Sequence, residues 1–145
     1  MNEFTGHYAS VIWVTLAYLL LYYVFLIYGL KVKLKVVAEC RAKGEPFDRY
    51  NGQYPELLAA DRMQLNTLEH MPPFLTLLWL QAAVDTPQNA TILGSVYVLL
   101  RMLYPFFLGK TLKRYIPKRL LINTFTGYAV LVLMMVFIAK ALLSS

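Results

Sequence analysis

Long apolar stretches alternate with short polar ones along the chain, and their lengths predict four helices. Residues 8–30 carry no charge and are long enough to cross a hydrocarbon core of about 30 Å at about 1.5 Å per residue. Three more stretches follow, at roughly 55–84, 90–109 and 119–143. Pro55 suits the first turn of the second helix, and Pro87 and Pro117 separate the later ones. We therefore expect an all-α fold, an integral membrane four-helix bundle in which residues 1–145 form a single domain.

Composition supports a membrane protein and excludes some chemistry. Of the 145 residues, 59% are hydrophobic, and the start lacks the Lys or Arg of a signal peptide. Cys40 is the single cysteine, so no internal disulfide is expected. The two histidines, His7 and His70, lack a metal-ligand spacing, and we expect no metal site.

Basic residues are concentrated in two of the predicted loops. Eleven of the 14 lie between helices one and two or between three and four: Lys31, Lys33, Lys35, Arg41, Lys43, Arg49, Lys110, Lys113, Arg114, Lys118 and Arg119. Short basic loops stay in the cytoplasm. We therefore expect loops 31–54 and 110–118 to be cytoplasmic and both termini to be non-cytoplasmic, in a membrane whose identity is undetermined. The net charge of +6 then reflects topology and contact with anionic lipid, and not binding of nucleic acid.

Helix two is unusually polar for a membrane span. At about 100° per residue, Arg62, Asn66 and Glu69 share one stripe, whereas Gln64 points the opposite way and His70 lies about a quarter turn aside. Charged groups in a membrane interior are costly, and their presence indicates a functional site. The two prolines that follow, at positions 72 and 73, predict a kink near residues 68–70.

Helix three carries a second stripe, formed by Arg101, Tyr104 and Leu108, and by Leu112 and Tyr115 if the helix continues so far. Arg62 and Arg101 are expected at a similar depth, about 10–12 Å below the basic surface. Two interpretations remain open. The cluster either binds an anionic ligand, or it forms a structural network in which Glu69 pairs with Arg62 or Arg101 and Asn66 bridges the helices.

Two segments carry a resemblance to a known family. "DRMQLNTLEHMPPFLTLLWL" at 61–80 has an Arg-x-x-x-Asn-x-x-Glu spacing followed by Pro and an aromatic residue, and "VYVLLRMLYPFFLG" covers 96–109. Both resemble the membrane-associated proteins in eicosanoid and glutathione metabolism, the MAPEG family. The resemblance is closest to microsomal glutathione transferases and implies a homotrimer with glutathione bound between subunits. It also implies site residues, which match the family's glutathione contacts by position: Arg62, Gln64, Asn66, Glu69, His70, Arg101 and Tyr104.

The residue that would stabilise the glutathione thiolate differs from the family pattern. The family's synthases use an arginine near the cytoplasmic end of helix three, and the resemblance aligns Tyr115 with it, beside Arg114. His70 likewise stands where the family has tyrosine. Arg114, Tyr115 and Tyr104 are therefore the candidate catalytic residues.

Two functions fit the sequence. The first is a glutathione transferase or peroxidase that acts on lipophilic electrophiles taken from the bilayer, as in detoxification. The second is a non-catalytic lipid-binding or scaffolding protein of the same fold. A transporter fits less well, because the polar groups cluster at one depth and do not line a path across the membrane.

Overall fold

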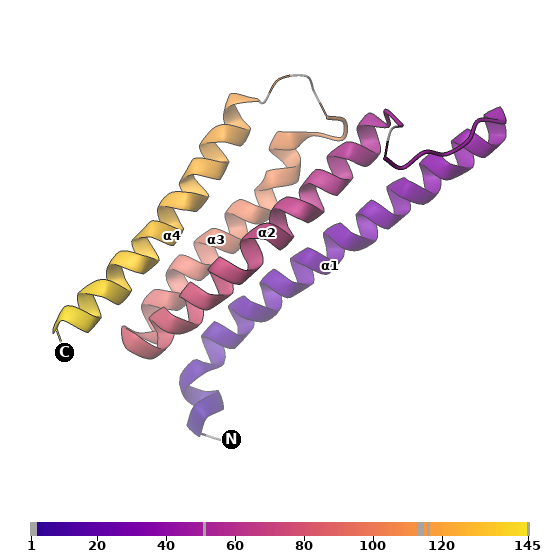
Figure 1. The fold of residues 1–145 in the computed structure, drawn as a ribbon. Coiled ribbons are helices and arrows are strands. Elements are labelled where there is room, and N and C mark those ends of the chain that lie inside the picture. Colours follow the sequence, from indigo (N-terminus) through magenta and orange to yellow (C-terminus); the bar gives the residue numbers. More distant parts are fainter. Residues whose placement is uncertain (1–2, 51, 113–114, 116, 145) are drawn as a thin grey trace.

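The computed structural model describes residues 3–50, 52–112, 115 and 117–144. Its elements are α1 (Glu3–Lys43), α2 (Pro55–Val84), α3 (Pro87–Leu108) and α4 (Lys118–Ser144). Successive helices run in opposite directions, with the termini and the α2–α3 turn at one end of the bundle and the two longer connections at the other (Figure 1). We call this second end the basic end, after its lysines and arginines. The described residues contain helices and no strand, which confirms the all-α prediction.

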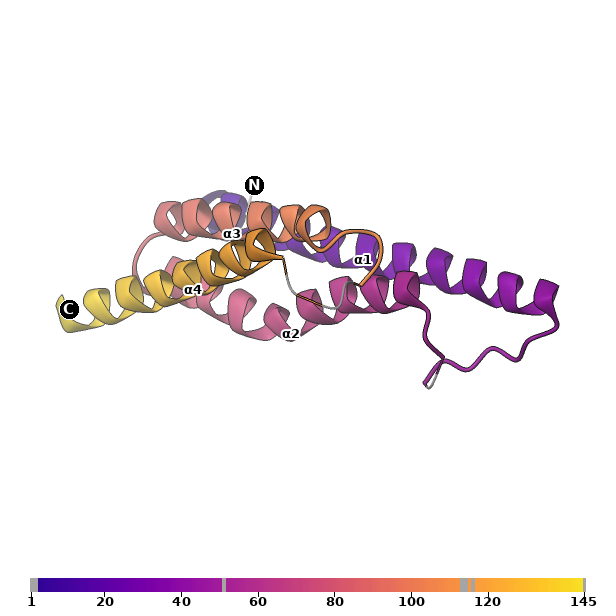
Figure 2. The ribbon, with the colours of Figure 1, turned by 90° about the horizontal axis from the view of Figure 1, so that it is seen from above.

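Helices α2 and α3 form the middle of the bundle. Each contacts the other three helices, whereas α1 and α4 make no contact with each other within the described residues. In the view from above, α1 projects from the bundle at one side and the C-terminal part of α4 at the other (Figure 2). A side chain on α2 or α3 can therefore meet partners from several helices.

Helix α1 extends well past its apolar stretch and ends at Lys43. Its last turns remain helical because Val32, Val36 and Cys40, spaced four apart, pack on Leu57 and Ala60 of α2. Gly44 then ends the helix with a φ of 71°, a conformation that glycine adopts without steric cost. The apolar stretch, residues 8–30, is the part of α1 that is expected to cross the membrane, and the helix itself continues beyond it.

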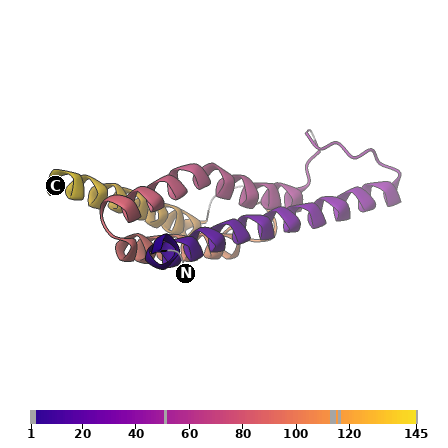
Figure 3. The same cartoon turned by 90° about the horizontal axis from the view of Figure 1, so that it is seen from below.

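Helix α2 begins with Pro55 in its first turn and continues without a break through Pro72 and Pro73. Seen from below, it bows away from α1 near its middle, as expected where two prolines remove backbone hydrogen bonds (Figure 3). The Tyr18 hydroxyl on α1 donates to the Thr67 carbonyl at 2.7 Å and fastens the two helices there.

Helix α3 differs from its predicted bounds at both ends. Pro87 belongs to its first turn, and the Thr86 side chain accepts a hydrogen bond from the Asn89 N–H at 3.2 Å as an N-cap. Helix α3 ends at Leu108, and Gly109 has a φ of 85°. The continuation of the helix to Leu112 and Tyr115 is therefore wrong.

Three of the described helices, α1, α3 and α4, are long and apolar enough to cross a membrane. Helix α2 has the length but not the composition, because its first half carries several charged and amide side chains. The chain is thus a membrane protein with at least three candidate spans in the described residues. Whether α2 also crosses depends on what covers its polar face.

Buried apolar side chains form two further clusters besides the one that joins Val32, Val36 and Cys40 to α2. One, around Phe74, Leu78 and Tyr97, fills the end that holds the termini, and another, around Met63, Tyr104 and Leu108, fills the basic end between α2, α3 and α4. Arg101 is buried between these clusters. This polar layer is where the candidate site lies.

Candidate functional site

Arg101 is the most buried charged side chain described in the bundle, with 2% of its surface exposed. One guanidinium nitrogen donates to the Asn66 side-chain oxygen on α2, and the other donates to the Tyr97 hydroxyl at 2.9 Å. The guanidinium carbon also lies 4.9 Å from the centre of the Tyr97 ring, a cation–π contact. The guanidinium is thus hydrogen-bonded, but by neutral groups alone within the described residues.

Arg62 and Glu69 occupy the exposed side of the α2 stripe, and Asn66 lies between them and Arg101. Neither Arg62 nor Glu69 belongs to an ion pair in the part of the chain that the structure describes; the pairs found join Lys35 to Glu39 and Glu56, and Arg49 to Asp61. The structural interpretation's ion pair between Glu69 and Arg62 or Arg101 is therefore not found among the described residues. Its Asn66 bridge between helices is present.

The structure brings α4 into the site, which the sequence did not indicate. The His70 ring lies 5.3 Å from the Tyr128 ring of α4. Gly127, one residue earlier, lies against the guanidinium, since a Cβ there would lie 3.5 Å from an Arg101 nitrogen, at ordinary contact distance. The spacing of four residues between Tyr97 and Arg101 could have identified Tyr97, but no local pattern points to Tyr128.

Of the two described candidate catalytic residues, Tyr104 and Tyr115, Tyr104 is the one that lies inside the bundle. It is on the same helix as Arg101, is 6% exposed, and its hydroxyl makes no hydrogen bond to another described residue. Tyr115 lies beyond the end of α3 and is 77% exposed. Arg114 lies outside the described residues.

Gln64 faces away from the stripe, as its position on the helix predicted. It lines a hollow of about 250 Å³ with Gly29 and Lys33 of α1, and a Cβ on Gly29 would lie 3.6 Å from its side-chain oxygen. Polar side chains of α2 are thus found on two separate faces of this chain. The hollow that contains Gln64 does not contain Arg62.

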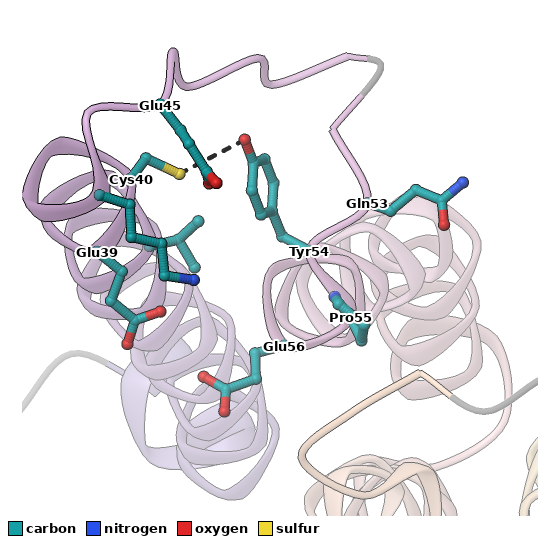
Figure 4. Close-up of a pocket in the computed structure, with 9 residues that line it drawn as sticks. Glu39, Cys40, Glu45, Gln53, Tyr54, Pro55 and Glu56 are labelled. Carbon is teal, nitrogen blue, oxygen red and sulfur yellow. Dashed lines mark hydrogen bonds between the residues drawn. The ribbon is translucent and has the colours of Figure 1, made fainter.

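Cys40 lies apart from this cluster, at the basic end. It lines a hollow of about 150 Å³ between the last turns of α1 and the start of α2 (Figure 4). Its sulfur lies 3.6 Å from the Tyr54 hydroxyl, and the same hydroxyl accepts a hydrogen bond from the Asp48 N–H at 3.3 Å. These contacts hold the loop of residues 44–54 against the helices, and no basic side chain is hydrogen-bonded to the thiol within the described residues.

Comparison with known proteins agrees with the resemblance. The family model for the MAPEG family matches residues 10–140, which span all four helices and every site residue discussed above. No curated protein matches the chain. The family match covers most of the chain, and the protein belongs to the MAPEG family, whose members include glutathione transferases and related membrane proteins.

Proposed function

We propose that this protein is a membrane-bound, glutathione-dependent transferase or peroxidase that acts on lipophilic electrophiles. The observation that carries the proposal is the buried Arg101 guanidinium, whose described hydrogen-bond partners, Asn66 and Tyr97, are both neutral. Burying a cation without a counter-charge is expensive. A carboxylate ligand bound beside it removes that cost, and members of this family commonly use glutathione.

Glutathione matches the charges of the stripe. Its two carboxylates suit the guanidinium groups of Arg62 and Arg101, and its ammonium suits the carboxylate of Glu69. Asn66 and His70 supply further hydrogen-bonding groups on the same helix. Bound in this way, the peptide pairs every charge on the stripe.

A second proposal concerns assembly. Arg62 and Glu69 are exposed on a helix that packs along three apolar candidate spans, and lipid contact with these charges would be costly. We infer that a neighbouring copy covers this face in a homotrimer and that α2 thereby crosses the membrane as a fourth span. The hollow of Gln64, Gly29 and Lys33 then supplies the other wall of the glutathione site from the adjacent subunit.

The proposed chemistry is thiolate addition to, or displacement on, an electrophile entering from the bilayer. Tyr104 donates its free hydroxyl to the sulfur, which lowers the free energy of the thiolate relative to the thiol. The site at the subunit boundary holds the thiolate and the electrophile next to each other. This proximity accounts for much of the rate increase over the reaction in solution. The basic end faces the cytoplasm in this proposal, which gives soluble glutathione a short path to the site.

Binding is tested by replacing the exposed charges of the stripe. Arg62→Gln or Glu69→Gln is expected to weaken glutathione binding by about 10–150-fold, because each loses a charge-assisted hydrogen bond of about 1.5–3 kcal/mol. The stability without glutathione is measured for each variant as its own baseline, because the neighbouring copy covers both side chains in the proposed homotrimer. Thermal unfolding at increasing glutathione concentrations measures both quantities.

Matched controls are Arg41→Gln and Glu45→Gln, which remove exposed charges at the basic end outside the stripe. Both should keep the wild-type response. Absence of any glutathione-dependent stabilisation in the wild-type protein would refute the proposal.

Catalysis is tested at Tyr104. Tyr104→Phe is expected to lower the turnover of glutathione conjugation to an aryl halide by about 100–1,000-fold, as for loss of one donor to a developing anion. Glutathione affinity should stay nearly unchanged, while the thiolate absorbance of the bound complex falls. Tyr50→Phe, at a tyrosine that is 91% exposed, is the control.

The same assay separates the second candidate function, a non-catalytic lipid-binding or scaffolding protein. That candidate is favoured by the end of α3 at Leu108, which removes Tyr115 from the Arg101 stripe. It predicts no conjugation in the wild-type protein even when glutathione binds. Loss of turnover in Tyr115→Phe or Arg114→Gln, with Tyr104→Phe still active, would instead assign the thiolate partner to the α3–α4 loop.

A further inference from the structure

A second cavity lies on the side of the bundle where α1 meets α3, near the basic end. Its volume is about 520 Å³, within the range of about 300–1,000 Å³ that is usual for small-molecule sites. Val24 of α1 and Phe106 of α3 are exposed wall residues, and the buried side chains of Phe25 and Met63 close the inner side. The space is therefore an apolar groove along two membrane helices.

Two polar side chains line this groove. Lys110, two residues after the end of α3, and Tyr28 of α1 form neither an ion pair nor a side-chain hydrogen bond with another described residue. Tyr28 lies three residues before Lys31, the first lysine after the apolar stretch. Tyrosine and lysine are typical residues of the membrane–water interface, where phospholipid headgroups lie. The groove thus opens at headgroup depth.

The groove is separate from the proposed glutathione site. Helix α1 contributes different residues to the two spaces: Gly29 and Lys33 line the hollow that contains Gln64, whereas Val24 and Tyr28 line the apolar groove. The groove contains none of the charged residues of the α2 stripe. The wall of the groove is apolar and lies on membrane helices. It carries no stripe charge that another subunit would have to cover, so it can contact lipid directly.

We propose that the groove binds one acyl chain of an anionic glycerophospholipid from the leaflet at the basic end. Lys110 pairs with the phosphate, and Tyr28 donates a hydrogen bond to an ester carbonyl below it. A free fatty acid offers a single carboxylate and has no separate ester carbonyl for Tyr28. The basic loops beside the groove favour an anionic over a zwitterionic headgroup.

The contact between the groove and the acyl chain is tested by a substitution whose side chain fills the groove. The full-length protein is purified in detergent, and bound phosphatidylglycerol is counted by native mass spectrometry. Val24→Trp should reduce the bound lipid at least tenfold, because the indole occupies the path of the chain. Val132→Trp is the matched control. Val132 of α4 is 53% exposed, close to the 50% of Val24, and it lines none of the cavities described above. The Val24→Trp protein should keep its glutathione-dependent stabilisation, so that this test is independent of the proposed function.

The headgroup contact is tested by competition. Wild-type protein should prefer phosphatidylglycerol to phosphatidylcholine by about tenfold or more, and Lys110→Ala should remove the preference, whereas Lys118→Ala, at the same end but outside the groove, should keep it. Equal lipid retention by the Val24→Trp and Val132→Trp proteins would overturn the proposal. So would equal binding of the two lipids, displacement by oleate at equal concentration, or a change of oligomeric mass in Val24→Trp without a change in bound lipid.

Discussion

Arg101→Met is expected to abolish stabilisation by glutathione while leaving the stability of the unliganded protein within about 1–2 kcal/mol of wild type. The substitution forfeits hydrogen bonds to Asn66 and to the Tyr97 hydroxyl. It also removes a buried cation that has no carboxylate partner among the described residues, and each buried ion carries a desolvation penalty of several kcal/mol. The two effects oppose each other in the free protein. With glutathione present, only the wild-type protein gains a charge pair.

The measurement is thermal unfolding with and without glutathione. At a glutathione concentration about 100 times the dissociation constant, a bound protein gains about 2.7 kcal/mol, which is large enough to resolve. Arg119→Met, at an exposed arginine of the basic end, should respond as wild type. A loss of about 3–5 kcal/mol in unliganded Arg101→Met, with no glutathione effect in either protein, would support a purely structural network instead.

Gly94→Leu is expected to destabilise the protein by about 3 kcal/mol or more, in the absence of any ligand. A single Cβ at Gly94 of α3 would lie 2.7 Å from a methyl carbon of Leu78 and 2.9 Å from one of Val14. Both neighbours are buried in the same cluster and have little room to move, so that extra atoms force strain on α1, α2 and α3 together. A fall in the denaturation temperature, measured in the same detergent, is the readout.

Gly127 provides the contrasting control. A Cβ there would make ordinary contacts, 3.5 Å to Arg101 and 3.6 Å to Tyr97. Gly127→Ala should therefore be neutral or slightly stabilising, because alanine is favoured over glycine inside a helix by about 1 kcal/mol. Equal tolerance of Gly94→Leu and Gly127→Ala would contradict the close packing at Gly94.

The sequence predicted the four helices but not all of the residues at which they begin and end. The hydropathy pattern found four helices, but α1 continues to Lys43 because its last turns pack on α2. Helix α3 stops at Leu108, and that end removes Tyr115 from the Arg101 stripe. The end of α1 and the end of α3 both depend on packing and backbone conformation, which cannot be predicted from the periodic pattern of apolar side chains.

The sequence predicted which residues belong to the candidate site better than it predicted which of them contact one another. Helical geometry correctly separated Gln64 from the stripe and placed Asn66 within it. One of the two open interpretations paired Glu69 with an arginine, whereas Arg101 contacts Asn66 and Tyr97. The structure joins Arg101 to Asn66, one helical turn farther along α2 than Arg62, while the similar depth of Arg62 and Arg101 stays a prediction.

The sequence by itself determined the membrane class, the all-α fold, the family and the polar stripe on α2, because each follows from hydropathy, helical spacing or a local motif. Only the tertiary structure decided which of these groups meet. It brought Tyr128 of α4 to His70, buried Arg101 among neutral partners and placed no ion-pair partner for Glu69 among the described residues. The physical reason is that contacts between helices depend on their relative rotation and depth, and no local stretch of sequence specifies either.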